Sequence, residues 1–141
     1  MALPLVDGLV LSASLRDALT AHCLRELPLE GCGLLVGTSS DATVVRVVAT
    51  GNAAGSSRLY SVDSRDFLRA DRQAETDGLE IIGVFHSHTH TDPYPSPTDV
   101  AQAPDPGWHY VIVSLRHQVP SVRSYRIEQE KVTEEPVLEG R

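Results

Sequence analysis

Two histidines separated by a single residue, His86 and His88, directly follow an apolar stretch in the segment GVFHSHTHTDPYPSPTD. In an extended chain, residues two apart point to the same side, about 6.6 Å from each other, so both imidazoles can converge on one ion. Asp99, further along the segment, offers a third ligand. Two histidines, a carboxylate and an open fourth position are typical of catalytic zinc, which lowers the pKa of a bound water to about 7. The sequence therefore predicts one Zn²⁺ per chain and hydrolytic chemistry.

Each of these residues also has a purely structural interpretation. A lone His-x-His pair can be two surface histidines at a strand end. The run Ser96-Pro97-Thr98-Asp99 is typical of a helix start, with serine as N-cap, proline at the first helical position and aspartate completing a capping box. The two interpretations are compatible, because a capped helix is a rigid platform for a ligand.

The other histidines and the cysteines are weaker candidates for a metal site. His90 extends the strand away from a compact site and is not expected to be a ligand. Core or surface roles are expected for residues without partners nearby in sequence: His22, His109 and His117. Cys23 and Cys32 are expected to be small buried groups; one bridge between them stays open, but two cysteines do not make a disulfide framework. Glu30 lies at the start of an apolar strand, and composition alone predicts that it is a solvated turn residue.

A scaffold must position these residues, and the hydrophobic pattern predicts a mixed α/β domain with a largely antiparallel sheet flanked by helices. The expected strands are 9–11, 33–37, 43–49, 81–85, 110–115, 121–127 and 131–137. Between two of them lies a loop, 89–107, that contains five prolines. A loop of that length usually carries function.

Two helices are predicted. The first starts at a cap on Ser12 or Ser14 and runs to about residue 27. The second is capped by Asp63 and reaches about residue 76, where Asp77-Gly78 stops it. Its inward face is expected to comprise Phe67, Leu68 and Ala74.

Composition narrows the class of protein. The chain has 141 residues and a net charge of −7, from 19 acidic and 12 basic residues. This length predicts a single domain over 1–141 with a substantial core. The acidic balance, without a basic stripe, argues against nucleic acid and anionic membrane as partners. No apolar run approaches about 18 residues, and Asp7 interrupts an N-terminal stretch without a basic region, so we expect a cytoplasmic protein without a membrane span or signal peptide.

The spacing of five residues resembles the signature of the JAMM (MPN-plus) metalloprotease family. A glutamate before a buried strand, then His-Ser-His, seven residues, Ser, two residues and Asp stand here as Glu30, His86, His88, Ser96 and Asp99. The segments EGCGLLVG, WHYVIVSL and RSYRIEQEKVTEEPV also look like the short bacterial members, so the likeness covers nearly the whole chain. It implies the JAMM/MPN (cytidine-deaminase-like) fold.

Within the family, the sequence most resembles bacterial peptidases that remove cysteine from the C-terminus of a ubiquitin-like sulfur carrier ending in Gly-Gly, in cysteine biosynthesis. The resemblance implies zinc ligands at His86, His88 and Asp99. It further implies a general acid/base at Glu30 and an oxyanion-stabilising hydroxyl at Ser96. A tail would enter beside segment 50–62 or the proline-rich loop, and a homodimer is compatible with the sequence.

Other interpretations stay open at this stage. Thr89 replaces a proline found in eukaryotic relatives, and the long insertions that grip ubiquitin are missing, which disfavours deubiquitination. One alternative is an isopeptidase that removes a ubiquitin-like modifier from protein conjugates. Another, from a different class, is a non-catalytic MPN interaction scaffold. A metallo-β-lactamase is disfavoured, because Pro93 stands where the HxHxDH pattern that starts at His88 requires histidine.

Overall fold

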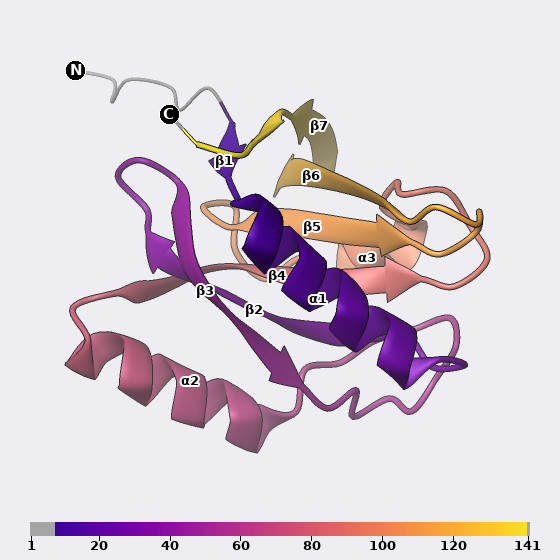
Figure 1. The fold of residues 1–141 in the computed structure, drawn as a ribbon, viewed down its shortest axis with the longest axis horizontal. Helices are drawn as coiled ribbons and strands as arrows, with labels where there is room; N and C mark the ends of the chain where they lie inside the picture. The colour runs from indigo at the N-terminus through magenta and orange to yellow at the C-terminus, as the bar shows by residue number, and fades with distance from the viewer. Residues whose placement is uncertain (1–7, 141) are drawn as a thin grey trace.

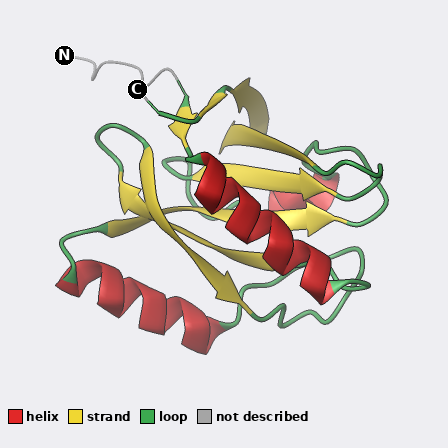
Figure 2. Cartoon of the chain, in the orientation of Figure 1, coloured by secondary structure: helices red, strands yellow, loops and turns green. Residues whose placement is uncertain are grey.

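An eight-stranded sheet forms the centre of the computed structural model, which describes residues 8–140 (Figures 1 and 2). The strands are β1 (Leu9–Val10), β2 (Cys32–Thr38), β3 (Thr43–Thr50), β4 (Glu80–His88), β5 (His109–Ser114), β6 (Ser121–Glu128), β7 (Lys131–Glu135) and β8 (Val137–Leu138). The helices are α1 (Ala13–Glu26), α2 (Ser64–Thr76) and α3 (Pro97–Ala101). No helix within residues 8–140 has the length and apolar character needed to cross a membrane.

The strands are arranged in the order β7-β6-β5-β4-β2-β3-β1-β8. Four of the seven ladders within residues 8–140 are antiparallel, in line with the predicted largely antiparallel sheet, and β1 runs parallel to β3 and to β8. β4 also runs parallel to β5, because the long loop with α3 carries the chain back across the sheet. β7 and β8 lie at opposite margins although only Pro136 separates them in sequence. The predicted single strand 131–137 is therefore wrong: proline cannot donate to a ladder, and the strand divides there.

Helices cover both faces of the sheet. Helix α1, capped by Ser12, packs Leu19 and Cys23 against one face and lies in front of the sheet in Figure 1. Helix α2 packs Ala70 and Ala74 on the other face, and the loop around α3 covers that same face further along. Side chains of a strand alternate between these two layers, so the parity of a residue decides which helices it meets.

The predicted inward face of α2 is partly wrong. Asp63 caps the helix as expected, its side chain accepting from the N–H groups of Arg65 and Asp66. Ala74 is buried and Phe67 packs against the core, but the side chain of Leu68 is 53% exposed. Leu68 follows Phe67 by one position, which is about 100° around the helix axis, and so it points to solvent.

Candidate metal centre and active site

His86 and His88 stand at the carboxyl end of β4, in the centre of the sheet. Their side chains lie on the same face of the sheet as that of Val84, which is the face covered by α3, whereas the side chain of Ser87 points toward α1. The two histidines are only 2% and 5% exposed. Such burial holds the imidazoles in fixed positions, whereas two surface histidines at a strand end would not be held in this way.

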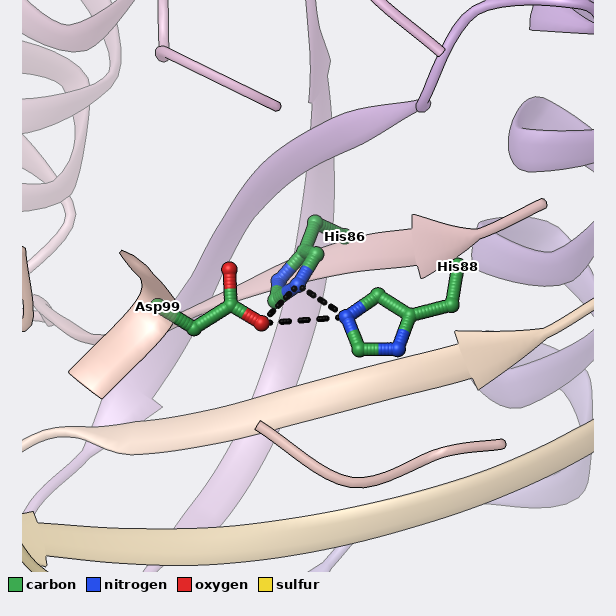
Figure 3. Close-up of side chains that lie close together, drawn as sticks. All are labelled: His86, His88 and Asp99. Carbon is green, nitrogen blue, oxygen red and sulfur yellow. Dashed lines mark hydrogen bonds and ion pairs between the residues drawn. The ribbon is translucent and has the colours of Figure 1, made fainter. Parts of the chain in front are cut away.

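Asp99 reaches the imidazoles from the first turn of α3. The predicted capping box is present: the Asp99 N–H donates to Ser96 Oγ at 3.0 Å, and the Ser96 N–H donates to Asp99 Oδ2 at 2.9 Å. The same carboxylate oxygen lies 3.2 Å from His86 Nε2 and 3.0 Å from His88 Nε2 (Figure 3). The helix cap and the candidate ligand are thus one side chain.

The triangle formed by His86 Nε2, His88 Nε2 and Asp99 Oδ2 suits a cation. The backbone carbonyl of Asp92 can only accept, so His88 Nδ1, at 2.9 Å, is its donor. In a neutral His88, Nε2 would therefore direct a lone pair at Asp99 Oδ2, so either a proton on Nε2 or a cation must lie between the two atoms. The separations of 3.0–3.2 Å among the three ligand atoms are near the roughly 3.3 Å expected between ligands of tetrahedral zinc. His86, His88 and Asp99 therefore fit a zinc ion.

Two of the three candidate ligands are in the protonation state that metal binding requires. Burial alone would raise the pKa of Asp99, but hydrogen bonds from both imidazoles hold that pKa far below its usual range. Burial lowers the pKa of His86, which keeps that imidazole neutral. For His88, burial lowers the pKa, but the hydrogen bonds to Asp99 and Asp92 outweigh it and the pKa is raised. The ionised Asp99 and the neutral His86 are thus in the state that metal binding requires, whereas a metal would have to displace the proton that Asp99 and Asp92 favour on His88.

Glu30 lies across the ladder from His88. The antiparallel register pairs Cys32 with His86, and the Ser87 N–H donates to the Gly31 carbonyl at 3.0 Å, so Glu30 comes next to His88. Its side chain is 4% exposed, and Oε1 has no hydrogen-bond partner. Burial raises the pKa of Glu30 to about 7, against a smaller opposing effect of His88. The interpretation as a solvated turn residue is therefore wrong, because the ladder draws Glu30 into the site.

Three contacts that the sequence interpretation missed fix the backbone of Glu30 and of Gly31 after it. The Glu30 N–H donates to the Ser56 carbonyl at 2.8 Å, and the Gly31 N–H donates to Ser87 Oγ at 2.8 Å. Helix α1 comes so close that a Cβ on Gly31 would lie 2.8 Å from Cys23 Cα. These contacts join segments that are far apart in the sequence, so no local sequence motif predicts them.

Asn52 organises the segment 51–63 and ties it to Glu30. Its Nδ2 donates to the carbonyls of Glu30, Ser56 and Leu59 at 3.0, 3.4 and 2.9 Å. Its Oδ1 accepts from the N–H groups of Ala54 and Ser61, both at 3.0 Å. One side chain thus fixes a loop and the glutamate together, a role that its position in sequence does not indicate.

Tyr60, in the same segment, covers His86. The two rings stack with centroids 4.1 Å apart and planes 16° from parallel. Burial raises the pKa of Tyr60, so the phenol stays neutral. The stack orients the His86 ring and shields it from water.

A cleft of about 430 Å³ opens beside the three candidate ligands. Ser57 and Arg58 line one part of it, and 89–91 with Ser96 line another, together with Glu30 and His88. The two segments that the sequence offered as alternative grips for a substrate tail therefore border one cleft. The Ser96 hydroxyl accepts from Asp99, which leaves its own proton available to a group in the cleft.

The remaining histidines and cysteines lie outside the triangle. His90 lines the cleft and pairs with the Thr89 hydroxyl at 2.8 Å. His109 is buried against Glu135 at 2.6 Å, His22 lies near two backbone carbonyls, and His117 is exposed. Cys23 and Cys32 are buried free thiols, as expected, and burial raises the pKa of Cys23 to about 12 and that of Cys32 to about 11. Neither thiol is ionised at neutral pH.

The raised pKa of Glu30 predicts a pH-dependent stability of the metal-free protein. Its folded pKa of about 7 exceeds the ordinary 4.5, so its contribution is complete below about pH 4.5 and is lost as pH rises through 7. Glu30→Gln should therefore stabilise the chelator-treated protein at pH 8 by up to about 3 kcal/mol, and hardly at all at pH 4.5. Urea unfolding at both pH values measures the difference. An equal effect at both pH values would mean that Glu30 is solvated.

The chain is similar to known proteins over most of its length. Residues 12–128 match the family described as prokaryotic homologs of the JAB domain. The chain is similar to the CysO-cysteine peptidase of Mycobacterium tuberculosis, with 42% identity over 131 residues, 92% of this chain and 89% of the relative. It is also similar to the desampylase of Haloferax volcanii, with 34% identity over 111 residues, 75% of this chain and 80% of the relative.

Solved structures show the same fold. A protein from Desulfitobacterium hafniense superposes with a TM-score of 0.85 at 34% identity, covering 94% of each chain. A JAB1/MPN domain protein from Archaeoglobus fulgidus superposes with a TM-score of 0.58 at 18% identity, covering 93% of this chain and 98% of the other. The predicted JAMM/MPN fold is therefore confirmed.

Proposed function

This chain belongs to the prokaryotic homologs of the JAB domain, and we propose that it is a zinc-dependent peptidase that trims a ubiquitin-like sulfur-carrier protein. It would hydrolyse the bond after the carrier's C-terminal glycine and release cysteine. The observation that carries the proposal is the convergence of His86, His88 and Asp99 beside a buried, unpaired Glu30. The named activity of the Mycobacterium relative supports the choice of substrate.

His86, His88 and Asp99 would hold the metal. Zinc bound there supplies a Lewis acid that polarises a carbonyl and lowers the pKa of water. The protein contributes the orientation of the ligands: the Asp92 carbonyl sets the tautomer of His88, Tyr60 packs on His86, and the capping box fixes Asp99.

Glu30 would act as the general base and then as the general acid. It takes a proton from the attacking water and later delivers that proton to the departing amine of the released residue. Oε1 is free of competing hydrogen bonds, and its pKa of about 7 is suited to exchanging a proton near neutral pH. Asn52 and Ser56 would position the glutamate from its backbone side.

Ser96 would stabilise the oxygen that becomes negative in the tetrahedral transition state. Its Oγ accepts from the Asp99 N–H, and its remaining proton can donate into the cleft. Ser96→Ala should therefore lower kcat by about 10²–10³. Ser96→Thr, which retains a hydroxyl and the cap, is the matched control and should recover most of the rate. An unchanged rate in Ser96→Ala would reduce Ser96 to a helix cap.

The substrate tail would lie extended in the cleft between Ser57–Arg58 and the loop that starts at Thr89. A carrier that ends in Gly-Gly suits this entrance, because glycine lets the backbone approach the ligands closely. The absence of long insertions in the chain favours a short, flexible tail over a folded conjugate.

The second candidate function is removal of a ubiquitin-like modifier from protein conjugates, which the likeness to the Haloferax desampylase favours. The two functions share a carrier with a C-terminal glycine and differ in the group released. A scaffold role without catalysis is disfavoured, because each of the five motif residues lies at the site or lines the cleft beside it.

The deciding experiment uses a Gly-Gly-ending ubiquitin-like sulfur carrier that bears one extra C-terminal cysteine. Intact-mass spectrometry follows the carrier with the purified protein, with and without chelator. We expect chelator-sensitive loss of one cysteine. No loss in zinc-loaded protein would refute the cysteine-releasing function, and cleavage of an isopeptide-linked conjugate in a parallel assay would then favour the second candidate.

A further inference from the structure

The outward face of α2 carries an unusual concentration of positive charge. Arg65, Arg69 and Arg72 recur at spacings of four and three, which places them along one stripe of the helix, and the exposed Leu68 lies beside them. We call these four residues the α2 basic face. They line a shallow groove of about 500 Å³ along the helix.

This charge stands out against the rest of the chain. Apart from these three arginines, the sequence has nine basic residues and 19 acidic ones. Within the described residues, Arg65 and Arg72 make no ion pair and no side-chain hydrogen bond, and Arg69, 80% exposed, has only a 3.7 Å contact to Asp66. Asp71 and Glu75 lie along the margin of the stripe. The arginines are therefore free to pair with an external partner.

Folding does not account for the α2 basic face. Ala70 and Ala74, on the other side of the helix, are buried against the sheet, so α2 is anchored without the arginines. No other element covers the outer side of α2 (Figure 1). Arginine around an exposed apolar side chain is the composition of protein-binding surfaces, where charged rims steer association.

The face connects directly to the cleft. Segment 51–63 supplies Ser57 and Arg58 to the cleft wall and ends at Asp63, the N-cap of α2. Asp66, in the first turn of α2, accepts from the Gly51 N–H at 3.0 Å, which fastens the helix start to that segment. The segment that forms one wall of the cleft therefore leads directly into the helix that carries the α2 basic face.

Resting on the proposed function, we propose that the α2 basic face docks an acidic surface on the folded body of the ubiquitin-like carrier. The cleft would bind the C-terminal tail of the carrier, and α2 would bind its folded body. Because the face lies outside the reacting groups, it would set the affinity for the intact carrier and leave the chemical step unaltered.

The test compares two substrates, the carrier with one extra C-terminal cysteine and a short peptide that copies its tail. The triple variant R65E/R69E/R72E should raise KM for the carrier by about 10- to 100-fold with kcat unchanged, and leave kcat/KM for the peptide unchanged. Added salt should weaken carrier cleavage by the original protein more than by the variant. The matched control R25E/R123E/K131E, with the same net charge on other surfaces, should keep the original KM.

Three results would overturn the docking surface: an unchanged carrier KM in the α2 variant, an equal rise of KM in the control, or an equal loss of activity toward the peptide. Failure of the proposed function looks different, because the unmodified protein would then cleave neither substrate. In that case, fluorescence polarisation of labelled carrier with the Glu30→Gln protein decides, and binding that R65E/R69E/R72E does not weaken would also refute the surface.

Discussion

Glu30→Gln should retain zinc at one ion per chain and lose turnover, with kcat for carrier cleavage lower by about 10²–10⁴. The amide matches the carboxylate in shape but cannot accept a proton, and the glutamate is not one of the three converging ligands. Elemental analysis of the purified variant and intact-mass assays measure the two quantities separately.

Glu80→Gln is the control for this substitution. Glu80 starts the same strand that ends in the histidines, and its carboxylate accepts from the N–H and the hydroxyl of Ser39 at the surface. Its replacement should change neither metal content nor rate. Loss of zinc from Glu30→Gln would contradict the assignment of Glu30 as a base and would make it a ligand, whereas full activity would remove it from the mechanism.

Asp99→Ala should lose both the metal and the activity, because two imidazoles alone hold zinc poorly. The change also removes half of the α3 capping box, which is worth about 1 kcal/mol. Asp99→Asn separates the two effects, since the amide oxygen can still accept from the Ser96 N–H but is a poor zinc ligand.

Zinc titration and thermal unfolding of both variants distinguish the outcomes. We expect zinc affinity to fall by at least about 10²-fold in both, and only Asp99→Ala to lose stability without metal. Normal zinc content in Asp99→Asn would mean that Asp99 serves the helix cap alone.

Much of the site could be predicted because its residues obey local rules. His86 and His88 share a side of a strand through the period of two, and Ser96 with Asp99 announces a capped helix by spacing alone. Phe67 and Ala74 followed the helical period, but Leu68 did not, since an apolar residue on a surface helix can serve a partner instead of the core.

The unpredicted parts depend on contacts between distant segments. Glu30 looked solvated because nothing near it in sequence buries it; its burial arises when β2 pairs with β4. Asn52 and Tyr60 act through a loop whose path only the assembled sheet defines. The parallel pairing of β4 with β5 likewise depends on a crossover that hydrophobic periodicity does not encode.

The position of β7 and β8 at opposite margins of one sheet has a consequence for the order in which the protein folds. Leu9 pairs with Val137, so the sheet is complete only after the chain has been synthesised past residue 137. Closing so long a loop costs more conformational entropy than pairing strands that are close together in the sequence. The hairpin of β2 and β3, followed by β4 and β5, can form earlier; β4 carries His86 and His88, and Glu30 lies two residues before β2. On a growing chain, the strands that position the candidate site would be paired before the margin of the sheet is complete.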